Sequence, residues 1–199
     1  LTEYFQSIGE KAFRAKQVFQ WLYQKNAYDF QEMSNIKNLE ISKKLTETTG
    51  LNTYLENDAN LACLAESCVG QGKDYRYVSF MTISTGVGAG FCIDKEIYQG
   101  AHGFGHEIAN MLLWMNGPSH GTIVPGGIEA ICSGTAIENR ARKVGLEVNH
   151  AGDVYTLAQN GNAIAAQIID DAKEYLANGI SIIYGLLDPE IVVLDIVGG

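Results

Sequence analysis

One stretch of the chain, residues 77–110, joins two strand-like runs through closely spaced glycines. The first run, residues 77–83, is rich in aromatic and β-branched residues, which favour strands. It is followed by STGVGAG at 84–90, and then by a second apolar run and a polar turn at 91–95. Glycines let a backbone approach a ligand closely and turn its N–H groups toward it. Two interpretations stay open: a turn that cradles a phosphate with the help of two hydroxyls, and a glycine-rich hairpin without a ligand.

The composition places the chain among folded globular proteins. Its 199 residues are 46% hydrophobic and 19% charged, enough for one substantial core or two small domains. No apolar run approaches the ~18 residues of a membrane span, and no signal peptide is visible. We therefore expect a cytoplasmic protein that has no membrane partner. We also expect free thiols at the four cysteines: Cys63, Cys68, Cys92 and Cys132.

The charge is unevenly distributed, which suggests two parts. Residues 1–49 carry a net charge of +1, whereas residues 50–199 carry −10. Residues 1–49 form a predicted small helical domain, with apolar residues at one-turn spacing (Ala15, Val18, Phe19 and Leu22) and a second helix after Ser34. Its lysines and arginines fit either a solvated face or a binding surface. The acidic part, residues 50–199, is not expected to bind nucleic acid.

An acidic helix start precedes the glycine stretch. Asn57 and Asp58 stand directly before an apolar helical run. Either residue can simply cap that helix. Alternatively, Asp58 is a carboxylate that accepts a proton from a substrate hydroxyl, since a helix N-terminus favours its ionised form.

The segments after the glycine stretch predict further helices and a last strand. His102 and His106 have metal-ligand spacing, but the glycines between them argue against a helix and a metal site. We expect a short helix to begin near Glu107 and Asn110. Longer helices are expected at 126–141 and 162–187, stopped by Asp188–Pro189, and a strand is expected at 190–194. These elements predict an α/β arrangement with a mixed sheet.

The N-terminal part has a specific resemblance. The blocks FRAKQVFQWLY and DFQEMSN, within residues 1–48, resemble the small N-terminal helical domain of the radical-SAM adenine-C2 RNA methyltransferases. That resemblance implies a domain that helps to hold RNA. The CxxxCxxC motif of the catalytic part of that family is absent from the sequence, so its activity is not implied.

Residues 56–199 resemble the middle of a sugar kinase of the ROK (repressor, open reading frame, kinase) family, such as glucokinase or N-acetylmannosamine kinase. Five blocks in the order of that family carry the resemblance: ENDANLACLAE, FMTISTGVGAGFCID, GAHGFGHEIAN, GGIEAICSGTAI and DPEIVVL before the closing diglycine. It implies an α/β, actin-like (ribonuclease H-like) ATPase fold, incomplete here and preceded by the small all-α domain. It also implies transfer of the γ-phosphoryl group of ATP, with Mg²⁺, to a sugar hydroxyl.

The same resemblance implies roles for individual residues. Asp58 is the catalytic base, and Asn57 holds a sugar hydroxyl beside it. The other sugar-binding residues it implies are Glu107, Asn110 and Glu129, and those facing the nucleotide phosphates are Thr85, Gly86 and Gly88. Carboxylates suit sugar binding because each ionised group accepts several hydrogen bonds. The implied partners are a hexose or N-acetylhexosamine and a second copy of the chain in a homodimer.

The sequence also departs from the pattern of that family. Asn110 stands where the family has a histidine that contacts sugar and zinc, and the segment directly before Gly127 lacks the cysteines that would complete the zinc site, so zinc is not expected. The Asp-x-Gly-Gly-Thr phosphate motif is absent, and the chain ends at the diglycine. We therefore expect an incomplete kinase with little activity as it stands. The alternatives are a sugar-responsive ROK transcription regulator and an RNA-binding module that uses residues 1–48.

Overall fold

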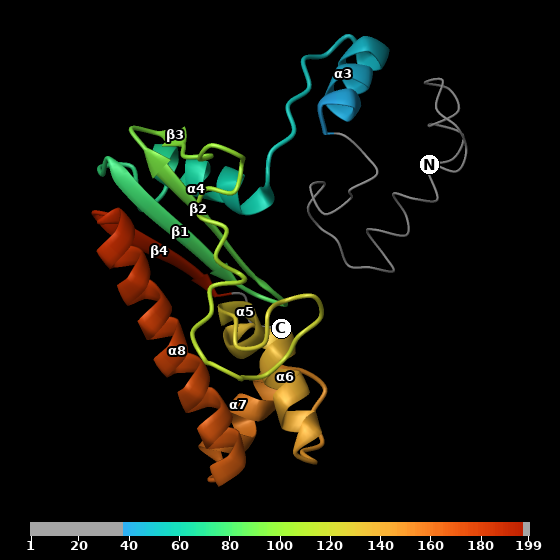
Figure 1. Cartoon of the computed structure of the whole chain (residues 1–199), viewed down its shortest axis with the longest axis vertical. Coiled ribbons are helices and arrows are strands. Elements are labelled where there is room, and N and C mark those ends of the chain that lie inside the picture. Colours follow the sequence, from blue (N-terminus) through green and yellow to red (C-terminus); the bar gives the residue numbers. More distant parts are fainter. Residues whose placement is uncertain (1–37, 197–199) are drawn as a thin grey trace. The chain divides into compact units, whose positions relative to one another are not determined.

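The computed structural model describes residues 38–196 and divides the chain into two compact units, Leu1–Asn57 and Asp58–Gly199 (Figure 1). In the first unit, helix α3 spans Asn38–Thr49. This helix confirms the one expected after Ser34, whereas the helix expected around residues 15–22 lies outside the described residues. Beyond α3 the chain turns back, because the Thr53 N–H donates to Thr46 Oγ1 at 3.0 Å.

The second unit is built on a mixed sheet in the order β3-β2-β1-β4 (Figure 1). Strands β1 and β2 pair antiparallel, and β1 pairs parallel with β4. The four strands are β1 (Tyr77–Ile83), β2 (Val87–Ile93), β3 (Glu96–Ile97) and β4 (Ile191–Ile196). The helices are α4 (Asp58–Val69), α5 (Ile128–Cys132), α6 (Gly134–Lys143), α7 (Ala151–Gln159) and α8 (Ala163–Leu187). The predicted mixed sheet is confirmed.

Alternate residues of β1 enter two different cores, as expected for a strand buried on both faces. Val78 and Phe80 pack with Cys63 of α4 on one face. Met81 and Ile83 pack on the other face, against α5 and the second half of α8. A third cluster joins α6, α7 and the first half of α8. The sheet therefore lies between α4 and a helical layer.

Two predicted boundaries proved reliable because local chemistry sets them. Helix α8 begins after Asn162, whose Oδ1 accepts from the Ala165 N–H at 3.0 Å, and it ends at Asp188, which is left-handed at φ +45°. The turn Asp94–Lys95 has positive φ at both residues, as a two-residue hairpin between β2 and β3 requires.

Three local predictions are corrected by the structure. The helix expected over 126–141 is two helices, because Ser133 is extended and its Oγ caps α6 through the Ala136 N–H at 3.1 Å. No helix begins near Glu107, since that segment pairs with the chain just before α5. Strand β2 begins at Val87 rather than Phe91, so two of the three glycines lie within the strand.

Candidate functional site

A short turn between β1 and β2 forms the centre of the candidate site. The Ser84 N–H donates to the Gly86 carbonyl at 2.9 Å, and Thr85 is exposed at the tip. The Ser84 carbonyl accepts from the Gly134 N–H at 2.7 Å. A Cβ atom at Gly134 would lie 3.0 Å from that same oxygen, so a glycine allows α6 to begin this close to the turn. The turn is thus held from the helical layer.

Glu129 of α5 also reaches this turn. Its Oε2 accepts from the Val87 N–H at 2.9 Å, and a Cβ atom at Gly86 would lie 2.8 Å from the same oxygen. Glu129 was predicted to bind sugar, and Gly86 was predicted to face phosphates. The structure therefore brings one residue of each predicted group into contact.

Helix α4 carries Asp58 to the same hairpin. A Cβ atom at Gly88 would lie 3.2 Å from the Ala59 Cβ, and one at Gly90 would lie 2.7 Å from the Cys63 Cβ. The lack of side chains on β2 therefore lets the first turns of α4 lie directly on the strand. Asp58 is the first residue of that helix and is exposed, and its Oδ1 accepts from the Ala59 N–H at 2.9 Å.

The long connection between β3 and α5, residues 98–127, contributes the remaining predicted residues. It pairs with the chain around the start of α5: the Ile128 N–H donates to the Met111 carbonyl at 2.9 Å, and the Glu129 N–H to the Ala109 carbonyl at 3.3 Å. Asn110, which lies between those two carbonyls, is exposed, and its Oδ1 accepts from the Val124 N–H at 2.9 Å. Asn110 therefore lies close in the pairing to Glu129 and also closes its own loop.

Glu107 is exposed on the same connection, and its N–H donates to the Phe104 carbonyl at 3.2 Å. Asn57 belongs to the first unit, where its N–H donates to Glu56 Oε1 at 3.0 Å. All the assigned roles stay predictions: Glu129 contacts the β1–β2 turn at Val87, whereas Asp58 begins the helix that packs on β2.

His106 has a role that the sequence did not reveal. Its Nε2 lies 3.0 Å from the Oγ of Ser79, a fully buried residue of β1, and its ring lies 5.8 Å from that of Phe91. Burial lowers the pKa of His106 from 6.5 to about 4, so the ring is neutral at pH 7. Its backbone is left-handed, at φ +67°. His106 therefore fastens the Glu107 segment to the sheet.

Two further findings delimit the site. Within residues 38–196, no group of three or more metal-ligating side chains occurs, and no helix is long and apolar enough to cross a membrane. An open hollow lies at the other end of β1, and none of the predicted site residues lines it. The residues around that hollow are Tyr77, Tyr184, Leu187, Asp188, Pro189 and Glu190.

Comparison with known proteins places this geometry in context. The sequence profile of the ROK family matches residues 23–199. A glucokinase of Thermotoga maritima is 29% identical over 172 residues, covering 79% of this chain and 54% of its own length. A xylose repressor of Bacillus subtilis is 25% identical over 165 residues, covering 83% of this chain and 43% of its own. The chain thus spans about half the length of the curated relatives it matches.

A solved structure agrees with the sequence comparison. The ROK hexokinase of Thermus thermophilus superimposes with a TM-score of 0.73 at 30% identity, covering 79% of this chain and 53% of its own. The sequence comparison with the glucokinase and the structural comparison with the hexokinase therefore cover similar shares of this chain and of the relative.

Proposed function

Because this chain belongs to the ROK family, we propose that its second unit carries the phosphoryl-transfer site of a sugar kinase. The reaction transfers the γ-phosphoryl group of ATP to a hydroxyl of a hexose or an N-acetylhexosamine. The glucokinase and hexokinase relatives support the kinase class, and the residues of this chain support the assignment of roles.

The observation that carries the proposal is the contact between Glu129 and the β1–β2 turn. Phosphoryl transfer requires little covalent chemistry from the protein, but it requires the acceptor hydroxyl and the phosphate to be held close together. A carboxylate that binds the sugar should therefore lie beside the backbone that holds the phosphate. Glu129 Oε2 accepts from Val87 next to Gly86, and a carboxylate has further lone pairs with which to accept a sugar hydroxyl.

Asp58 is the proposed general base. It is exposed at the first turn of α4, where the helix N-terminus stabilises a negative charge, and α4 is packed onto β2 through Gly88 and Gly90. In the reaction, the Asp58 carboxylate accepts the proton of the sugar hydroxyl as the hydroxyl oxygen attacks the γ-phosphorus atom. The bond from that phosphorus to the bridging oxygen breaks, and ADP leaves with the electron pair.

The nucleotide phosphates are proposed to lie against Thr85, Gly86 and Gly88. The Thr85 hydroxyl is exposed at the tip of the turn, and a backbone without a side chain at Gly86 permits close approach. Bound Mg²⁺ would neutralise phosphate charge. Glu107 and Asn110 complete the proposed sugar site from the connection before α5.

The experiment that tests this proposal is detection of sugar phosphate by mass spectrometry after incubation with ATP, Mg²⁺ and a panel that includes glucose and N-acetylmannosamine. The expected rate lies well below the ~10 s⁻¹ of an ordinary enzyme, because the Asp-x-Gly-Gly-Thr motif is absent from the 199 residues. Asp58→Asn should lower the rate at least ~10²-fold, as expected for loss of a general base. Equal rates for the variant and the parent chain would refute the assignment of Asp58.

A sugar-responsive regulator is the second candidate, favoured by the xylose repressor among the relatives. Such a protein would bind a sugar without phosphorylating it. Saturable sugar binding with no sugar phosphate formed, in the same incubation, would support the regulator instead. RNA binding through residues 1–48 remains a prediction, which salt-dependent RNA binding would support.

A further inference from the structure

The connection between β3 and α5 holds Glu107 and Asn110, yet it contains no helix and no named strand anywhere between Ile97 and Ile128. A loop of this length needs specific contacts to keep binding side chains in place. In this loop, Trp114 forms both backbone hydrogen bonds and side-chain contacts that can do this.

The backbone of Trp114 closes the loop. Its N–H donates to the Gly126 carbonyl at 3.1 Å, and its carbonyl accepts from the Gly117 N–H at 2.9 Å. Gly126 is left-handed at φ +81°, and a Cβ atom there would lie 1.7 Å from the Trp114 carbonyl oxygen. Only glycine fits this approach, so Trp114 is joined directly to the segment that leads into α5.

The side chain of Trp114 contacts residues of two helices. Its ring stacks on that of Tyr175 of α8, with centroids 5.1 Å apart and an interplanar angle of 9°. The guanidinium of Arg140 of α6 lies 5.5 Å from the centre of the Trp114 ring. An arginine over a tryptophan face is attracted by the negative face of the ring, more strongly when it is removed from water.

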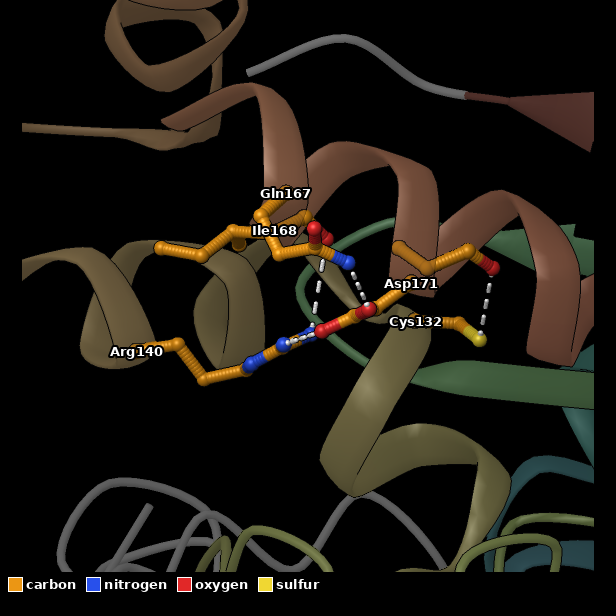
Figure 2. A network of polar contacts seen from close by, with 6 residues as sticks. Cys132, Arg140, Gln167, Ile168 and Asp171 are labelled. Atoms are coloured by element: carbon orange, nitrogen blue, oxygen red, sulfur yellow. Dashed lines mark hydrogen bonds and ion pairs between the residues drawn. The ribbon is translucent and has the colours of Figure 1, made fainter. Parts of the chain in front are cut away.

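Arg140 is itself fixed, as Figure 2 shows. It forms an ion pair with Asp171, and its Nη1 donates to the Ile168 carbonyl at 3.4 Å. Gln167 donates to the other oxygen of Asp171 at 2.8 Å. The side chains of Arg140 and Asp171 are only 14% and 17% exposed. The guanidinium is therefore a rigid, partly desolvated partner for the ring rather than a mobile surface charge.

We propose that Trp114 is a positioning residue of the sugar site: its ring, in contact with Tyr175 and Arg140, sets the register in which Asn110 lies beside Glu129. The register follows from consecutive hydrogen bonds. The Leu113 N–H donates to the Gly126 carbonyl at 2.9 Å, and the Ile128 N–H donates to the Met111 carbonyl at 2.9 Å. Displacing Trp114 would weaken the hydrogen bonds that join the segment at Met111–Leu113 to the segment at Gly126–Ile128. This inference rests on the proposed function only for the identity of the ligand.

The test compares three variants with the parent chain: Trp114→Ala, Trp114→Phe and Tyr175→Leu. The control is Tyr184→Ala, which alters a tyrosine of the same helix that is 60% exposed. Amide hydrogen exchange over residues 107–128 reports the loop, and ligand-observed NMR with glucose and N-acetylmannosamine reports the sugar affinity. Trp114→Ala and Tyr175→Leu should accelerate exchange at Leu113, Trp114 and Val124 at least tenfold, with β1 unchanged.

The same two variants should weaken sugar binding about tenfold or more, whereas Trp114→Phe should retain most of both properties because a phenyl ring can still stack. Unchanged exchange in the loop of Tyr175→Leu would overturn the proposal, even if Trp114→Ala fails to fold. Faster exchange with unaltered sugar affinity would also overturn it. If the parent chain binds no sugar, the proposed function fails, while the exchange data still decide whether the stack holds the loop.

Discussion

Replacement of Gly90 by alanine tests the packing that brings Asp58 to the hairpin. The new Cβ atom would lie 2.7 Å from the Cys63 Cβ, 2.9 Å from the Ala59 carbonyl oxygen and 3.1 Å from the Asn60 Cα. None of these atoms can rotate away, because each is fixed by the course of the α4 backbone. Helix α4 must therefore move off β2.

The expected cost follows from two opposing effects. Overpacking a well-packed site costs about 1–3 kcal/mol. Alanine also reduces the conformational entropy of the unfolded chain, which stabilises the folded state by roughly 0.5–1 kcal/mol. Gly90→Ala should thus lower the free energy of unfolding by about 1–2 kcal/mol. The matched control is Gly185→Ala in α8, where the new atom meets nothing within 4 Å. That variant should be more stable than the parent by up to about 1 kcal/mol.

The assay is urea unfolding at 25 °C, followed by far-UV circular dichroism, with the slope of the transition compared between the variants. A loss of stability in Gly90→Ala beside a gain in Gly185→Ala is the predicted result. If Gly90→Ala were as stable as the parent chain, α4 would not lie on β2 as described, and the placement of Asp58 at the hairpin would lose its support.

Three further predictions concern the connection between β3 and α5. Burial lowers the pKa of His106 from 6.5 to about 4, so its contribution to stability is present above pH 6.5 and is lost as the pH falls toward 4. Between those pH values, the free energy of unfolding of the parent should fall by about 3 kcal/mol more than that of His106→Asn. Equal losses in the two proteins would contradict the burial of that ring. Gly126→Ala should destabilise by more than 2 kcal/mol in the same urea assay, because its Cβ atom would overlap the Trp114 carbonyl, and a neutral result would contradict the loop closure. Metal analysis of the purified chain should find no stoichiometric zinc, because Asn110 replaces the expected histidine; one tightly held zinc per chain would refute this.

The sequence predicted the parts of the fold that local patterns determine. Strand β1, α8 with its asparagine cap, and the left-handed turn after β2 each carry their signal within a few residues. The family resemblance from residue 56 onward is confirmed, and with it the actin-like ATPase fold, of which this chain covers a part.

The sequence could not predict features that depend on residues far apart in the chain. Gly88 and Gly90 also admit α4, through Ala59 and Cys63, which lie 29 and 27 positions earlier in the chain. The position of Ser133 looked like the interior of a helix, because its capping contact becomes evident only once α6 is defined. Trp114 carried no signal at all, since its partners lie on α6 and α8.

The same limit applies to the predicted site. Its residues could be selected by resemblance, but the contact between Glu129 and Val87 spans 42 positions of sequence and is not visible in any local pattern. The domain boundary near residue 50 and the roles assigned to the site residues stay predictions.

The most direct test of the account is the affinity of the 199-residue chain for a hexose or N-acetylhexosamine, measured by ligand-observed NMR for the parent, Glu129→Gln and the control Glu174→Gln. Glutamine at 129 keeps an oxygen for the Val87 N–H but loses the charge that strengthens a bond to a sugar hydroxyl, an effect of about 1.5 kcal/mol or more. The account predicts weak, saturable binding of one sugar by the parent and the exposed α8 control, and roughly tenfold weaker binding by Glu129→Gln. Equal affinity in all three proteins, or no binding of any hexose, would contradict it.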